Sequence, residues 1–204
     1  MEKFLDVITK RKSVKHYEKN VKIKRKEILA MLDYANTAPS AYNLQPWRYI
    51  IVDTKKNLNK LKKINYNKTQ QETSSATIIV LADKNYADKY DEIYNEAVEK
   101  KFITVETKEK LKQIITSDIN SQTENEKLKN IIFDCALWVM QFCNVAKSFK
   151  YDTNIMGGFN KEELRKQFNI EENYEILVLI SLGKVEKQGY KTTRIQAKKL
   201  AKFI

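Results

Sequence analysis

Three cations and a hydroxyl lie close together near the start of the chain. Arg11, Lys12 and Lys15 flank Ser13, directly after a short amphipathic stretch. Guanidinium and ammonium groups make charge-assisted hydrogen bonds to phosphate oxygens, and backbone N–H groups add to them. The segment is therefore a candidate phosphate site. Taken alone, however, a solvated basic turn after a helix describes it better.

Both prolines of the chain fall in one segment, APSAYNLQPW at residues 38–47, so its backbone is stiff. Between them Ser40, Asn43 and Gln45 offer neutral hydrogen-bonding groups beside a predicted strand. A stiff loop that holds such groups suits one wall of a site for a planar heterocycle. The alternative is a rigid connector with Trp47 in the core.

A third segment, IMGGFN at residues 155–160, contains two of the chain's four glycines. Glycine allows a backbone to approach a ligand closely. Gly157 and Gly158 are therefore candidates for backbone contacts to a cofactor. The alternative is a tight turn before the helix predicted to begin at Lys161.

Apolar residues at helical spacing predict helices, and short β-branched runs predict strands. The predicted helices cover 4–10, 28–35, 54–64, 86–101, 108–119, 127–149 and 161–168, and the predicted strands cover 48–53, 76–81 and 176–182. The strand at 76–81 is expected to be central, and 65–75 is predicted to be a polar loop. The helix at 127–149 is apolar on more than one side, so it belongs at the centre of the fold or at a dimer interface. The pattern predicts one α+β domain over 1–204, with 190–204 as a C-terminal arm.

The composition limits the possible functions. The net charge of +12 makes nucleic acid a possible partner, but the lysines are spread along the chain and mixed with acids, as on solvated helix faces. No secretory signal or apolar span is present, which predicts a soluble cytoplasmic protein. Cys135 and Cys143 fall in one predicted helix about 12 Å apart, too far for a disulfide, so buried thiols are expected. With His16 as the only histidine, no zinc site is expected.

Together the three segments resemble the nitroreductase family of flavoproteins. That family carries an R-[RK]-S-x-R/K segment, then A-P-S-x-x-N-x-Q-P-W, and later a G-F-x turn. The second motif is matched almost letter for letter at 38–47, and the order of motifs is kept over essentially the whole chain. The resemblance implies an α+β nitroreductase-like fold, with a central, mostly antiparallel sheet flanked by helices. It also implies a long central helix at a homodimer interface.

The resemblance further implies FMN as the cofactor. Arg11 and Ser13 would contact the phosphate, with Lys12 contributing through its backbone. Lys15 would point at the N1–C2 edge of the flavin. Two-electron reduction leaves negative charge at that edge, and a fixed cation stabilises it.

Other positions of the family motifs complete the implied site. Pro39, Ser40 and Asn43 would reach the flavin of the opposite subunit. Asn67 and Gln70 have the family spacing for the pyrimidine side of the ring. Some relatives carry Lys where this chain has Gln70, which would make the flavin harder to reduce here.

The glycine turn and the arm supply the remaining implied contacts. Gly157 and Gly158 would donate N–H groups near flavin N5 and O4, with Met156 adjacent. Lys191 and Arg194 resemble a C-terminal cationic pair that closes on the phosphate.

The implied reaction passes a hydride from NADH or NADPH through flavin N5 to a nitroaromatic, a quinone or a similar small acceptor. No side chain is assigned as catalytic, because the flavin carries the chemistry. Two alternatives stay open. One is a flavoenzyme of the same fold with a different oxidation or a dehalogenation reaction, and the other is a basic nucleic-acid-binding module.

Overall fold

The structure is a computed structural model that describes residues 4–66 and 68–204. Its helices are α1 (Phe4–Lys10), α2 (Arg25–Ala35), α3 (Lys55–Ile64), α4 (Lys68–Thr73), α5 (Tyr90–Glu99), α6 (Val105–Ser121), α7 (Glu124–Ser148) and α8 (Lys161–Phe168). Its strands are β1 (His16–Tyr17), β2 (Trp47–Val52), β3 (Ala76–Asp83), β4 (Asp152–Met156), β5 (Tyr174–Gly183) and β6 (Val185–Lys187). Short 3₁₀ turns, η1, η2 and η3, lie at Ala41–Asn43, Tyr86–Lys89 and Ala197–Lys199.

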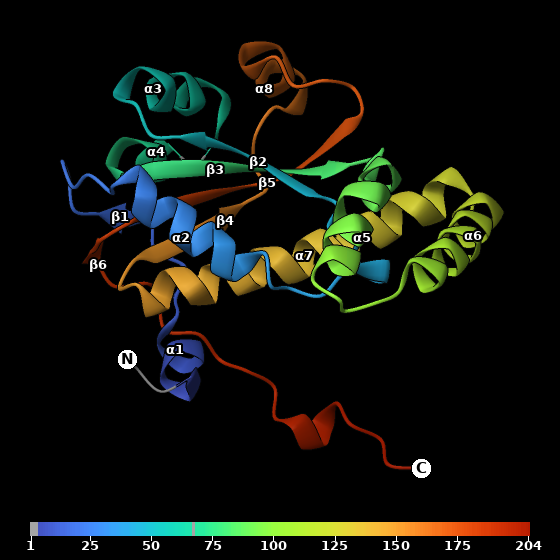
Figure 1. The fold of residues 1–204 in the computed structure, drawn as a ribbon. Coiled ribbons are helices and arrows are strands. Elements are labelled where there is room, and N and C mark those ends of the chain that lie inside the picture. Colours follow the sequence, from blue (N-terminus) through green and yellow to red (C-terminus); the bar gives the residue numbers. More distant parts are fainter. Residues whose placement is uncertain (1–3, 67) are drawn as a thin grey trace.

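A four-stranded antiparallel sheet in the order β2-β3-β5-β4 lies at the centre of the fold. A separate ribbon pairs β1 with β6 and so joins the two ends of the domain. Helices α2 and α7 cover one face of the sheet, and α3 and α8 cover the other (Figure 1). Strand β3 is buried at every position, which confirms the predicted central strand.

Alternate residues of the inner strands enter two separate cores, as the two-residue period of a strand requires. Ile78, Val80 and Ile180 pack with α2 and α7, whereas Ile79 and Leu179 pack with α3 and α8. Since both faces are covered, these strands carry continuous apolar runs without polar alternation.

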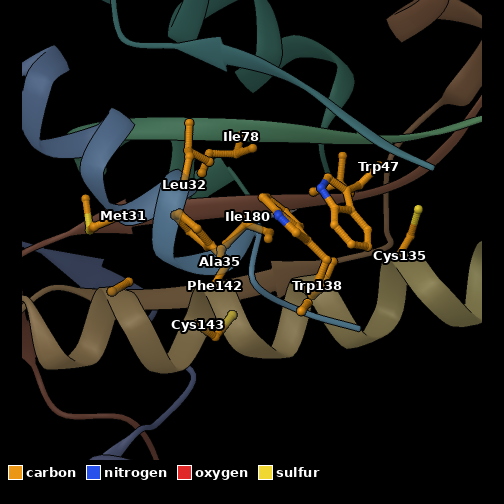
Figure 2. Close-up of a cluster of buried hydrophobic side chains, with 14 of the residues drawn as sticks. Met31, Leu32, Ala35, Trp47, Ile78, Cys135, Trp138, Phe142, Cys143 and Ile180 are labelled. Carbon is orange, nitrogen blue, oxygen red and sulfur yellow. The ribbon is translucent and has the colours of Figure 1, made fainter. Parts of the chain in front are cut away.

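The core between α7 and the sheet is built around Trp138. Its ring stacks on those of Tyr49 and Phe142, with centroids 5.3 and 5.5 Å apart. Its indole N–H donates to Asn36 Oδ1 at 2.9 Å, so its polar atom is satisfied as well. Figure 2 shows Trp138 and Phe142 on α7 among the side chains between that helix and the sheet. The long apolar helix of the sequence is therefore central to the fold of a single chain.

One prediction of local structure was wrong. Residues 65–75 were expected to be a loop, but they contain α4. Its buried side chains are polar, and hydrogen bonds such as Thr77 Oγ1 to Gln71 Oε1 at 2.8 Å stabilise them. Apolar periodicity cannot reveal such a helix. Ahead of the glycine turn, Ile155 and Met156 belong to strand β4, which apolar spacing did not predict.

The end of β5 is packed tightly against Tyr17 of β1. Tyr17 is fully buried, and its hydroxyl lies 2.8 Å from Ser181 Oγ. A Cβ at Gly183 would lie only 2.9 Å from Cδ1 of this ring. The absence of a side chain at Gly183 therefore allows the ribbon to dock on the sheet.

We expect Gly183→Ala to destabilise the protein by about 1–3 kcal/mol, because the added methyl overpacks a ring that is held at both ends. Gly157→Ala is the matched control, since no heavy atom lies within 4 Å of a Cβ built there. It should stay within about 0.5 kcal/mol of wild type. Urea unfolding of flavin-free protein measures both, and equal stabilities would contradict the tight packing.

Candidate functional site

The cationic segment lies along the free edge of β4. Ser13 forms a parallel bridge with Thr153, and the Val14 amide donates to the Thr153 carbonyl at 3.0 Å. Strand β4 is the last strand of the sheet, so this contact fixes the segment to a rigid element. The pairing holds the neighbouring cations in a defined place, as a binding site requires.

The cations of this segment lie apart from the carboxylates of the described residues. Within residues 4–66 and 68–204, no Asp or Glu is in ion-pairing distance of Arg11, Lys12 or Lys15. Burial raises the pKa of the Cys143 thiol, and the nearby Arg11 guanidinium offsets part of that rise, which places Arg11 beside α7. Uncompensated cations beside backbone amides fit a phosphate group, so these residues suit the predicted role.

The start of the C-terminal arm crosses the same segment. A Cβ at Gly189 would lie 2.6 Å from the Ser13 carbonyl oxygen, so the two backbones are in close contact. The ammonium of Lys15 lies 5.4 Å from the centre of the Tyr190 ring, in a cation–π arrangement. The arm therefore begins as a cover over the cations.

The predicted pair in the arm is not gathered at the site. Lys191 and Arg194 are both exposed, and the Arg194 guanidinium bonds the neighbouring Thr193 carbonyl at 2.7 Å. Beyond Tyr190 the arm runs away from the body of the molecule, on the same side as α1 (Figure 1). Within one chain, Lys191 lies near Ser13 only because it directly follows Gly189 and Tyr190.

The glycine turn lies at the other end of β4. Asn65 Nδ2 is 3.3 Å from Met156 Sδ, and the Tyr66 amide donates to the Gly158 carbonyl at 3.0 Å. Since Met156 follows Thr153 by three positions, the turn is about 10 Å from the cationic segment along the strand. The structure thus brings the first and third motifs to the same strand.

The polar pair predicted for the pyrimidine side is described only in part. Asn67 lies outside the described residues. Gln70 is on α4 with 3% of its surface exposed, and so offers little surface to a bound ring in this form of the chain.

The proline loop has an unusual backbone. Tyr42, Asn43 and Gln45 have φ values of 53°, 55° and 48°, in the left-handed region that non-glycine residues rarely adopt. Hydrogen bonds hold this shape. The Gln45 amide donates to Ser40 Oγ at 3.0 Å, and the Ala41 amide donates to a carboxylate of α7 at 3.1 Å.

That carboxylate belongs to Asp134, which is 7% exposed. Burial raises its pKa, and the hydrogen bond from Ala41 offsets part of the rise. A second anchor comes from β2, where Arg48 donates to the Gln45 carbonyl at 2.9 Å and pairs with Asp83 at 3.1 Å. The loop is thus fastened to both α7 and the sheet.

The proline loop and the cationic segment do not meet within one chain. Asp134 holds the loop, whereas Arg11 lies near Cys143, nine positions further along α7. At the rise of an α-helix, this separation is about 14 Å. The structure therefore brings two of the three predicted motifs together and leaves the second apart.

A cleft of about 510 Å³ opens beside the proline loop, between α6 and α7. Sequence reasoning gave no role to Asp118, Gln122 or Asp134, which help to line it. Only Asp134 left a signal, because it is an acid in an otherwise apolar helical stripe. The other two sit on polar helix surfaces that look like ordinary solvated faces.

The chain belongs to the nitroreductase family, whose model matches residues 8–184. It is 35% identical to YdgI of Bacillus subtilis, provisionally named an NAD(P)H nitroreductase, over 98% of this chain and 97% of that protein. It is 31% identical to the CLA biosynthesis enone reductase of Lactiplantibacillus plantarum, over 98% of this chain and 93% of that one.

Solved structures give the same result. A protein from Exiguobacterium sibiricum, provisionally named a nitroreductase and crystallised with FMN, matches with a TM-score of 0.97 and 32% identity. The match covers 100% of this chain and 98% of that one. The predicted family and the predicted fold are confirmed. None of the helices in the described ranges combines the length and hydropathy that a bilayer span requires.

The buried carboxylate of Asp134 makes stability depend on pH. Because its pKa is raised in the folded state, the fold holds this proton more tightly than the unfolded chain does. Stability is therefore lost as pH rises through the interval between the unfolded and folded pKa values. Asp134→Asn keeps an acceptor for Ala41 without the charge, and should gain stability over wild type at neutral pH but not below about pH 4.

Asp134→Ala removes the acceptor and should cost about 1–3 kcal/mol at both pH values. Asp88→Asn, which removes an exposed carboxylate, is the control and should stay within about 0.5 kcal/mol of wild type. Urea unfolding across the pH range measures all three. A pH profile of Asp134→Asn parallel to that of wild type would contradict the raised pKa.

Proposed function

We propose that this chain is an FMN-dependent oxidoreductase that takes a hydride from NADH or NADPH and passes it to a small acceptor such as a quinone or a nitroaromatic. The observation that carries the proposal is the row of uncompensated cations along the β4 edge, beside the glycine turn. Family membership supports it, as do the relatives named for NAD(P)H and the FMN-bound structure of a similar protein. With a quinone, one hydride and one proton give the hydroquinone.

The cationic segment binds the phosphate end of the cofactor in this proposal. Arg11 and Ser13 contact the phosphate, and Lys12 adds its backbone N–H. Lys15 stands further along the same segment and stabilises negative charge at the pyrimidine edge of the ring. FMN, when bound, supplies the hydride transfer, and these residues orient it and set its electrostatics.

The other predicted contacts remain part of the proposal. Met156, Gly157 and Gly158 border the redox-active edge of the ring, where a Cβ at Gly157 would meet open space. Asn67 and Gln70 are assigned to the pyrimidine side. Lys191 and Arg194 belong to the arm at 190–204, which closes the phosphate end in the assembled protein.

We also propose a homodimer in which Pro39, Ser40 and Asn43 reach the flavin of the opposite subunit. The isolated chain exposes 13223 Å², whereas a monomer of 24.0 kDa exposes roughly 9,900 Å². Part of the excess is apolar and lies on α7, where Phe133 is 66% and Met140 is 41% exposed. These two are seven positions apart and share one helix face. A second copy would cover that face and complete the site.

The proposed setting is a reducing cytoplasm. Cys135 and Cys143 are both free and buried, as the sequence predicted. A different reaction on the same fold is the main alternative, since fold alone does not fix the substrate and one relative is named an enone reductase. A nucleic-acid-binding module would lack the flavin absorption that the proposed enzyme must have.

The purified protein should absorb as a flavoprotein and oxidise NADH or NADPH when a quinone is added. Arg11→Ala should raise the Kd for FMN by roughly 10- to 100-fold, because it removes a charge-assisted hydrogen bond worth about 1.5–3 kcal/mol. The matched control is Lys22→Ala, an exposed cation ahead of α2. Fluorescence titration of the apoprotein with FMN measures both variants. Equal affinities would remove Arg11 from the phosphate site, and a wild type that refuses FMN would overturn the proposed function.

Met140→Asp should dissociate the dimer, because it places a charge in the apolar face of α7. The same variant should lose FMN, since each flavin needs the partner's proline loop. Phe102→Asp is the control, because Phe102 is 75% exposed in the turn between α5 and α6. Analytical ultracentrifugation with detection of flavin absorbance gives mass and cofactor content together. A monomer with full flavin content would contradict the shared site.

A further inference from the structure

The cleft beside the proline loop has a charge opposite to that of the whole chain. Its walls contain the carboxylates of Asp118 and Asp134, and none of its lining residues is Lys, Arg or His. The chain as a whole carries a net charge of +12. Neither carboxylate forms an ion pair within residues 4–66 and 68–204. The cleft is therefore locally negative in a basic protein.

Neutral donors hold Asp118 in place. The hydroxyl of Tyr42 donates to Asp118 Oδ2 at 3.1 Å, and Gln122 Nε2 donates to the same oxygen at 3.0 Å. Asn130 of α7 donates in turn to Gln122 Oε1 at 2.9 Å. Since these partners carry no charge, they fix the carboxylate at the wall and leave its negative charge uncompensated.

The rest of the cleft is apolar and partly aromatic. Tyr42 and Tyr86 contribute rings, and Ile131 and Leu137 contribute aliphatic surface. Such walls suit a flat molecule of modest size. The Tyr94 hydroxyl donates to the Tyr42 carbonyl at 3.0 Å, so α5 also keeps the left-handed loop in position.

The cleft also adjoins the residues proposed to reach the partner's flavin. Pro39 and Ser40 are in its lining, together with Ala41 and Tyr42. A molecule that lies in the cleft would therefore border the ring held by the opposite subunit.

We propose that this cleft receives the electron acceptor, and that Asp118 and Asp134 make the enzyme select uncharged or cationic planar acceptors over acceptors that carry a carboxylate. The proposal rests on the proposed function and adds a substrate class to it. An anionic acceptor would approach two fixed negative charges within an apolar wall, where water screens them poorly. A neutral quinone or a nitroaromatic amide meets no such repulsion.

The test compares 4-nitrobenzamide with 4-nitrobenzoate, which have the same ring and differ in charge. In the first two-electron step each nitro group takes a hydride from NAD(P)H and a proton, and releases water to give the nitroso compound. The measured quantity is the ratio of kcat/KM for the benzoate to kcat/KM for the benzamide. The intrinsic reactivity of the two substrates is the same for every variant. A change in this ratio between variants therefore reports the effect of the substituted charge in the cleft.

Wild type should have a ratio well below one, and Asp118→Asn should raise it about tenfold, as removal of a nearby charge predicts. The Asn side chain keeps an acceptor for Tyr42. Gln122→Lys is a second variant, because it places an ammonium beside Asp118 and should raise the ratio as well. Glu109→Gln removes a charge from α6 outside the cleft and should leave the ratio and the activity at wild-type values.

Anaerobic reduction of the bound flavin by NAD(P)H is followed in the same samples. Wild type that binds FMN but is not reduced would overturn both the function and this inference. Normal reduction, with a wild-type ratio near one or with a ratio unchanged in Asp118→Asn and Gln122→Lys, would overturn the inference alone.

Discussion

The burial of α7 against the sheet sets the spacing between two parts of the candidate site. Trp138, stacked between Tyr49 and Phe142, locks the middle of this helix onto β2 and α2. With the middle fixed, one part of α7 presents Asp134 to the proline loop, and a later part lies beside Arg11. A packed helix of this length deforms little. It therefore sets the distance between the two motifs.

A consequence is that, within one chain, the cationic edge and the stiff polar loop lie beside parts of α7 that are about 14 Å apart. The exposed apolar residues of α7 lie on a helix face that the sheet does not cover. The protruding α1 and the arm add further apolar surface, such as Phe4 and Phe203. In the proposed homodimer, a two-fold partner would cover that surface and bring its proline loop to the cationic edge. Assembly and cofactor binding would then be linked through the same helix.

Much of the fold follows from apolar spacing alone, because α2, α3, α7 and the inner strands are defined by what they bury. Helix α4 does not follow, since its buried groups are amides and hydroxyls whose partners lie on the strands β1 and β3. The separate motifs were also visible in the sequence, but their meeting on β4 depends on the long-range pairing of Ser13 with Thr153. Asp118 could not be predicted, because only the folded chain places Tyr42 and Gln122 around it.

The net charge of the protein and the local charges of its sites act on ligands at different distances. A net charge of +12 draws anions toward the molecule over a distance of about a Debye length, and both FMN and the nicotinamide nucleotides are anions. At short range, charged side chains in fixed positions then select between ligands. At the β4 edge these are uncompensated cations, which suit a phosphate. In the cleft they are Asp118 and Asp134, whose carboxylates face an apolar wall. Because repulsion at a few ångströms outweighs a screened attraction from the surface, the proposed acceptor site would keep its own preference within a basic protein.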